Sequence, residues 1–84
     1  MNIANVDSVV SLIWNTEHWL YKIVPYIGIN GPYSILDKKS VGGVVANGIV
    51  TAAIKQAGLK LNEEERTEVK CRIGERISAT WGAL

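Results

Sequence analysis

Residues 41–57 read VGGVVANGIVTAAIKQA, an apolar stretch with three glycines and one charged side chain. On a helical wheel most of its polar residues gather in one narrow strip, formed by Ser40, Asn47, Thr51 and Lys55. A helix that is apolar over the rest of its circumference is normally enclosed by neighbours. Each glycine costs a helix up to about 1 kcal/mol relative to alanine, and close approach of a neighbouring backbone is the usual compensation. We therefore expect a helix that packs tightly on several sides.

A longer helix is predicted before this stretch. Apolar residues recur at helical spacing over residues 4–24. Pro25 is predicted to end that helix, because the residue before a proline is pushed away from helical geometry. A connector follows over residues 25–37, where an Asn-Gly-Pro triplet at positions 30–32 is a strong turn signal. The glycine-containing helix is then expected over residues 39–57.

The start of the last predicted helix, residues 62–82, carries the clearest local signals. Asn62 is a good N-cap, and Glu65 falls three residues later, as a capping box requires. Glutamates at positions 63–65 occupy the first turn, where the helix dipole favours negative charge. The chain is long enough for one domain. We therefore predict a single all-α domain over residues 1–84, a small bundle of three main helices.

The composition excludes several classes of function. With one cysteine, Cys71, and one histidine, His18, the chain forms neither an internal disulfide nor a Cys/His zinc site. A net charge of +1 argues against an electrostatic nucleic-acid binder, so no nucleic acid is expected as a partner. Glu17 and His18 are neighbours on a helix and point about 100° apart, so they do not face each other as an acid–base pair. We expect no enzymatic activity, no cofactor and no metal.

The apolar surface exceeds what a three-helix monomer of this size requires, so we expect part of it to be covered by a partner. In the last helix, Gly74, Ser78 and Gly82 are spaced four apart and form a shallow groove that admits another helix. Glu17 projects into the apolar side of the first helix. It is interpreted either as a buried carboxylate that pairs with a cation and sets the register of an assembly, or as a residue at the wet edge. The residues expected at an interface are Glu17, Trp14, Trp19, Gly43, Gly48, Lys55, Gly74, Ser78 and Gly82.

These features favour a small, non-catalytic structural or assembly protein that acts through helix packing, in a homo-oligomer or a virion-like particle. Two alternatives stay open: a membrane-active, holin-like protein, and an adaptor or inhibitor that binds a larger protein. The segment 59–77, a charged helix after a short apolar one, resembles the tails of some small phage holins, although the spanning segment of that family is missing here. The longest uncharged central run, residues 40–54, is too short to span a bilayer. We expect the protein in the cytoplasm or an assembled particle, with a membrane surface as the alternative site.

Overall fold

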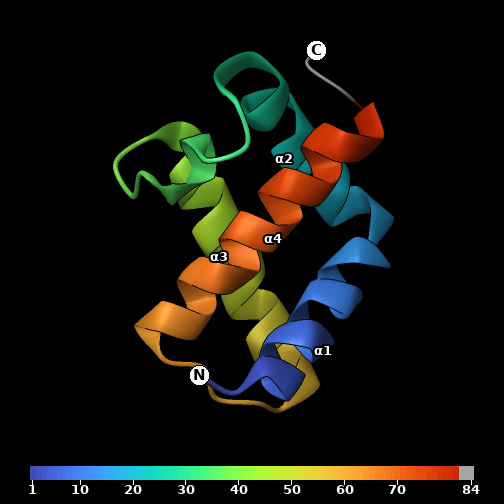
Figure 1. Cartoon of the computed structure of the whole chain (residues 1–84), viewed down its shortest axis with the longest axis vertical. Helices are drawn as coiled ribbons and strands as arrows, with labels where there is room; N and C mark the ends of the chain where they lie inside the picture. Colours follow the sequence, from blue (N-terminus) through green and yellow to red (C-terminus); the bar gives the residue numbers. More distant parts are fainter. Residues whose placement is uncertain (82–84) are drawn as a thin grey trace.

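The computed structural model describes the backbone of residues 1–81 and the side chains of residues 1–27 and 31–80. Over that part the chain is mostly helical and contains no strand, so the predicted all-α class is confirmed. Its elements, in chain order, are α1 (Ile3–Trp14), α2 (Glu17–Asn30), the short 3-10 helix η1 (Ser34–Leu36), α3 (Val41–Ala57) and α4 (Glu63–Trp81) (Figure 1).

The prediction of three main helices is wrong, because residues 4–24 do not form one helix. The chain breaks after Trp14, and four helices result. At the break, the hydroxyl of Thr16 donates to the backbone carbonyl of Leu12 at 2.7 Å. The backbone N–H of Asn15 donates to the carbonyl of Ser11 at 2.9 Å and closes α1. The chain can therefore change direction here without leaving these backbone groups unpaired.

Pro25 was also expected to end a helix, and instead it lies inside α2. A proline inside a helix costs about 3 kcal/mol or more, because it removes one backbone hydrogen bond and crowds the preceding turn. Ile23 and Ile27, on either side of Pro25, are both buried. Burying two such side chains contributes about 1.5–3 kcal/mol each. Packing thus outweighs the local signal, and the helix continues to Asn30, after which Gly31 adopts a positive φ of 89°.

The connector is consequently shorter than the predicted residues 25–37. It runs between α2 and α3, contains η1, and places Ile35 in the core. The start of α3 is fixed by Ser40, whose hydroxyl accepts a hydrogen bond from the backbone N–H of Gly43 at 2.9 Å. Gly58 ends α3 in the left-handed conformation, at a φ of 69°. Both ends of α3 therefore follow from local capping chemistry.

The predicted capping box at the start of α4 is present. The backbone N–H of Glu65 donates to the Asn62 side chain, and the backbone N–H of Asn62 donates to Oε1 of Glu65, both at 2.9 Å. The second carboxylate oxygen of Glu65 accepts from the backbone N–H of Asn2 at 2.7 Å. One side chain, only 6% exposed, thus joins the beginning of α1 to the beginning of α4.

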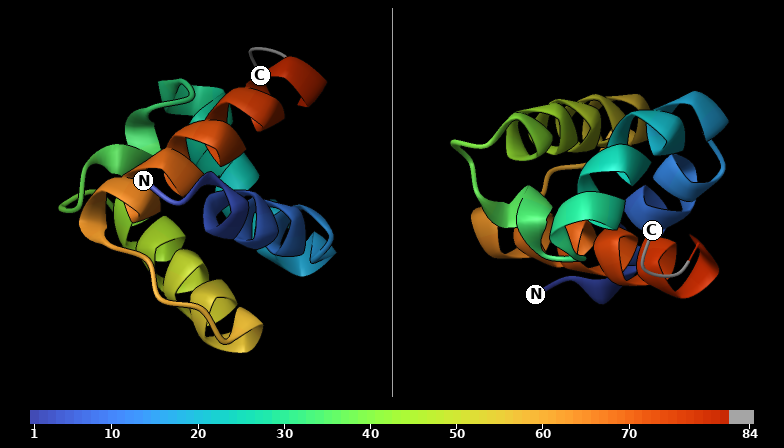
Figure 2. Two further views of the ribbon diagram at one scale, coloured as in Figure 1. Left: turned by 60° about the horizontal axis from the view of Figure 1, so that its bottom comes forward. Right: turned by 90° about the horizontal axis from the view of Figure 1, so that it is seen from above.

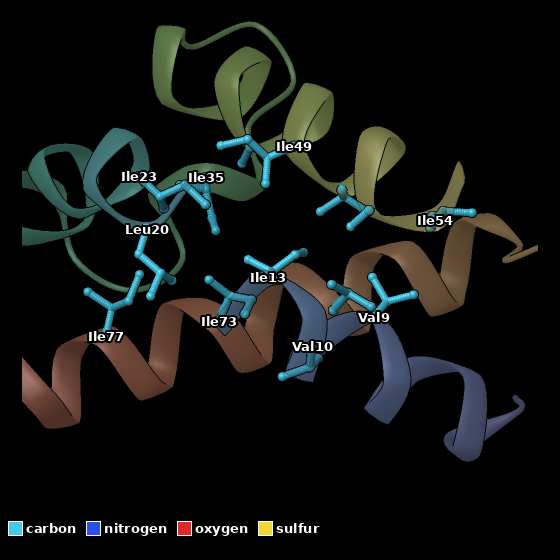
Figure 3. Close-up of a cluster of buried hydrophobic side chains, with 14 of the residues drawn as sticks. Val9, Val10, Ile13, Leu20, Ile23, Ile35, Ile49, Ile54, Ile73 and Ile77 are labelled. Carbon is cyan, nitrogen blue, oxygen red and sulfur yellow. The ribbon is translucent and has the colours of Figure 1, made fainter. Parts of the chain in front are cut away.

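The core lies where all four helices meet, and it is built almost wholly from branched aliphatic residues (Figure 3). Helix α1 contributes Val9 and Ile13, and α4 contributes Ile73 and Ile77 from the facing side. Seen from above, α3 forms one side of the molecule and α4 the other (Figure 2, right). This arrangement buries one side of α3 and leaves its opposite side facing solvent.

Candidate interaction surface

An open groove runs between α2 and α3, with a volume of about 670 Å³. It is mainly apolar and aromatic in character. Its lining residues are Trp19, Tyr21, Lys22, Pro25 and Tyr26 from α2, and Val44, Val45, Gly48, Ile49 and Ala52 from α3. The aromatic side chains of α2 and the small residues Gly48 and Ala52 of α3 line the same groove, and these small residues leave space beside the rings. At Gly48 an added Cβ would meet no atom within 4 Å, so this position opens directly to solvent.

A second hollow of about 390 Å³ continues from the first, since Tyr26 lines both. It extends past Val41 to Tyr33 on the connector. Helix α3 presents Val44 to the first hollow and Val41 to the second, and these side chains are 60% and 67% exposed. We name the combined surface the α2–α3 face, defined by Trp19, Tyr21, Tyr26, Val41, Val44 and Gly48.

The charge around this face is mostly positive. Residues 18–62 contain five lysines and one aspartate, whereas the rest of the chain contains four basic and seven acidic residues. Lys22 lines the groove. Lys55 is exposed on α3, seven residues after Gly48 and therefore on the same side of the helix. Among these lysines Lys38 is paired, with Glu63 of α4. The α2–α3 face is thus apolar at its centre and bordered mainly by cations, although Asp37 lines the second hollow and Glu17 accepts a hydrogen bond from Tyr21.

Glu17 lies in the first turn of α2 and is exposed, because the break after α1 turns it away from the apolar side of that helix. It accepts a hydrogen bond from the Tyr21 hydroxyl at 3.1 Å, and this bond raises the pKa of Tyr21. Arginine side chains that could pair with a buried Glu17 have other contacts in the structure. Arg66 donates to the side chains of Asn47 and Thr51.

Arg76 lies over the ring of Trp14, with its guanidinium carbon 3.9 Å from the ring centroid. This cation–π contact joins α4 to α1 and is placed away from the groove. Trp19, in contrast, lines the groove directly. The two tryptophans that sequence reasoning grouped together are therefore assigned to different parts of the molecule.

The predicted close backbone approach occurs within the chain at two glycines. A Cβ at Gly43 would lie 1.7 Å from the carbonyl oxygen of Asp37, and a Cβ at Gly74 would lie 2.0 Å from that of Pro32. Both glycines thus hold the connector against the helices. Along the predicted Gly74, Ser78 and Gly82 groove, Gly74 contacts the connector and Ser78 is half-buried. Gly82 lies outside the described residues.

Several residues of the groove were missed by sequence reasoning, among them Lys22, Tyr26, Val44 and Ala52. A signal for the first two was present. Trp19, Lys22 and Tyr26 are spaced i, i+3 and i+7, which places them on one side of a helix that continues beyond Pro25. The assumption that Pro25 ends the helix concealed this spacing.

Lys70 of α4 is only 2% exposed. Burial lowers the pKa of its ammonium; the Glu63 carboxylate opposes that shift, and the nearby cations Arg66 and Lys38 reinforce it. A nucleophilic lysine needs access for a substrate. Lys70 lines neither of the two hollows described above. Lys70 therefore resembles a structural residue, and burying its charged ammonium costs desolvation free energy.

We predict that Lys70→Met stabilises the fold by about 1 kcal/mol at neutral pH, because the buried ammonium no longer has to be desolvated. The lowered pKa of Lys70 means that this cost applies while the lysine is charged and disappears as the pH rises toward the ordinary lysine value. The extra stability of Lys70→Met should therefore decrease in alkaline solution. Urea unfolding of Lys70→Met and of the exposed control Lys60→Met measures it, and a marked loss of stability in Lys70→Met would contradict the prediction.

Within residues 1–81, no group of three or more histidine, cysteine, aspartate or glutamate side chains is placed to hold a metal ion. No helix of that part is long and apolar enough to cross a membrane. Comparison with known proteins finds no family model, no curated protein and no solved structure that matches the chain.

Proposed function

We propose that this protein is a non-catalytic assembly protein that associates with copies of itself through its α2–α3 face. The observation that carries the proposal is the groove of about 670 Å³ beside Val41, Val44 and Tyr21, which are 60–67% exposed. Soluble monomers rarely expose contiguous apolar patches of this kind, and such patches commonly mark interaction sites. The polar side-chain groups that line the groove belong to Lys22, two tyrosines and Trp19, and they do not form an acid–base pair for catalysis.

Association through the α2–α3 face requires that several of its side chains become buried together. Burying one large apolar side chain contributes about 1.5–3 kcal/mol. Association costs at least about 4 kcal/mol in lost translational and rotational freedom. Burial of Val44 alone is therefore insufficient. Burial of Val41, Val44 and Tyr21 together, with the rings of Trp19 and Tyr26 in the groove, exceeds the lower estimate of that cost.

The experiment is a matched pair of substitutions on two exposed helical alanines. Ala52 lines the groove, and Ala79 lies on α4 outside it. We expect Ala52→Lys to weaken self-association at least about tenfold, because the long lysine side chain fills the hollow that the partner would occupy. Ala79→Lys should leave association unchanged. Sedimentation velocity compares both variants with the unmodified protein.

Circular dichroism provides the control, since both variants should keep the helix content and melting temperature of the unmodified protein. If Ala52→Lys associates as strongly as Ala79→Lys, the α2–α3 face is not the contact surface.

A second candidate function is peripheral binding to an anionic membrane. The specific observation in its favour is that Trp19, Tyr21 and Tyr26 lie on the same face as Lys22. Aromatic rings and lysines suit the headgroup region of a bilayer. Flotation with vesicles that contain phosphatidylserine separates the two candidates, because a self-assembling protein without membrane affinity stays in the dense fraction.

A further inference from the structure

We infer that the copies assemble head to tail: the α2–α3 face of one copy receives the exposed residues at the start of α1 of the next. This inference rests on the proposed self-association and adds its geometry. Two contacting surfaces that differ from each other generate chains or rings, whereas a surface that contacts itself generates a two-fold dimer.

Among the described residues, the large apolar side chains that are exposed lie either on the α2–α3 face and the adjoining Tyr33 or near the N-terminus. The group near the N-terminus consists of Met1 and Ile3, which are both about half exposed, and we name it the N-terminal patch. The backbone holds this patch in place: the N–H of Asn2 donates to Glu65, and the Asn2 side chain accepts from the N–H of Asn5 at 3.1 Å. The N-terminal patch is therefore a small projection on a fixed support.

The two patches lie on different sides of the molecule. Helix α3, which carries Val41 and Val44, forms one side, and the N-terminus lies on the opposite side, beyond α4 (Figure 2, right). The projection therefore cannot fill the groove of its own chain. A second copy can present its N-terminal patch to the groove while its own groove stays open for a third copy.

The charges also differ between the two patches. Asp7, Glu65 and Glu68 lie near the N-terminal patch, where the cations are Arg72, paired with Asp7 and Glu68, and the amino terminus, which faces Glu65. The groove is bordered by lysines instead. Contact between two α2–α3 faces would bring Lys22 and Lys55 of both copies together, and the Glu17 carboxylate beside Tyr21 balances only one of these two charges in each copy, which disfavours the contact. Contact between groove and N-terminal patch instead brings these lysines toward Asp7 and Glu68, two carboxylates that share one cation, Arg72.

Complementation between two variants tests this arrangement. Ile3→Lys damages the N-terminal patch and leaves the groove intact, and Ala52→Lys does the reverse. We expect each variant alone to associate at least about tenfold more weakly than the unmodified protein. An equal mixture should form a 1:1 heterodimer, because one intact groove meets one intact N-terminal patch. Analytical ultracentrifugation of each variant and of the mixture measures this, and circular dichroism verifies that both variants are folded.

The outcomes separate this inference from the proposed function. If Ile3→Lys associates as the unmodified protein does, the faces pair with each other and the head-to-tail arrangement is wrong. A mixture that stays monomeric overturns it as well. If the unmodified protein is itself monomeric at every concentration, the proposed function fails first, and flotation with anionic vesicles or capture of a different protein then identifies another occupant of the groove.

Discussion

Alanine at Gly43 or at Gly74 should destabilise the fold by at least about 3 kcal/mol, whereas alanine at Gly48 should stabilise it by up to about 1 kcal/mol. At the first two positions the new Cβ would lie 1.7 and 2.0 Å from backbone carbonyl oxygens of the connector. A backbone cannot move aside as a flexible side chain does, so the connector must leave its place. At Gly48 the Cβ meets open space, and only the helix propensity changes.

Thermal and urea unfolding of the three variants measure this difference. Domains of this size have total stabilities of roughly 5–15 kcal/mol, so the loss at Gly43 or Gly74 is a large part of the whole. We expect those variants to melt at least about 10 °C below the unmodified protein. Gly48→Ala is the matched control, since it makes the same chemical change in the same kind of helix. Equal effects at Gly43 and Gly48 would show that the connector does not press against α3.

Glu65→Ala should lower the melting temperature by about 10 °C, while Glu64→Ala should change it little. The Glu65 carboxylate accepts from the backbone N–H groups of Asn62 and Asn2, so its removal undoes the cap of α4 and the attachment of α1 together. Glu64 precedes it in the same turn and is exposed. The comparison therefore separates these hydrogen bonds from the general effect of a negative charge near the helix dipole.

The same carboxylate predicts a dependence of stability on pH. The hydrogen bonds from Asn62 and Asn2 lower the pKa of Glu65 in the folded state. Its contribution is therefore complete above the ordinary glutamate pKa and is lost as the pH falls through the lowered value. We expect the melting temperatures of Glu65→Ala and the unmodified protein to converge in acid. A constant gap between them down to low pH would contradict this assignment.

Features set by short-range chemistry could be predicted from the sequence. Asn62 and Glu65 form their capping box, and Gly58 ends α3, because each depends on hydrogen bonds within a few residues. The break at Thr16 and the continuation of α2 through Pro25 could not be predicted in this way. The continuation depends on burying Ile23 and Ile27 against other helices, and that burial outweighs the local preference of proline.

The candidate site was predicted in part. Trp19 and Gly48 were singled out from the sequence, and both lie in the groove. Gly43 and Gly74 were singled out for the same reason as Gly48, yet their neighbour is the connector of the same chain. Glycine in a helix indicates close approach or open space, and the pattern alone does not distinguish them. Only the tertiary structure distinguishes the two cases, because the Asp37 carbonyl lies against Gly43 whereas an added Cβ at Gly48 would meet no neighbouring atom.

The most direct measurement is sedimentation velocity of the unmodified protein over concentrations from low micromolar to millimolar. Association through an apolar face bordered by charge predicts that the weight-average mass rises with concentration beyond that of a dimer. It also predicts that added salt lowers the mass, since the proposed contact brings lysines of one copy toward carboxylates of the next. A well-folded species with the mass of one chain at every concentration would contradict the proposed self-association.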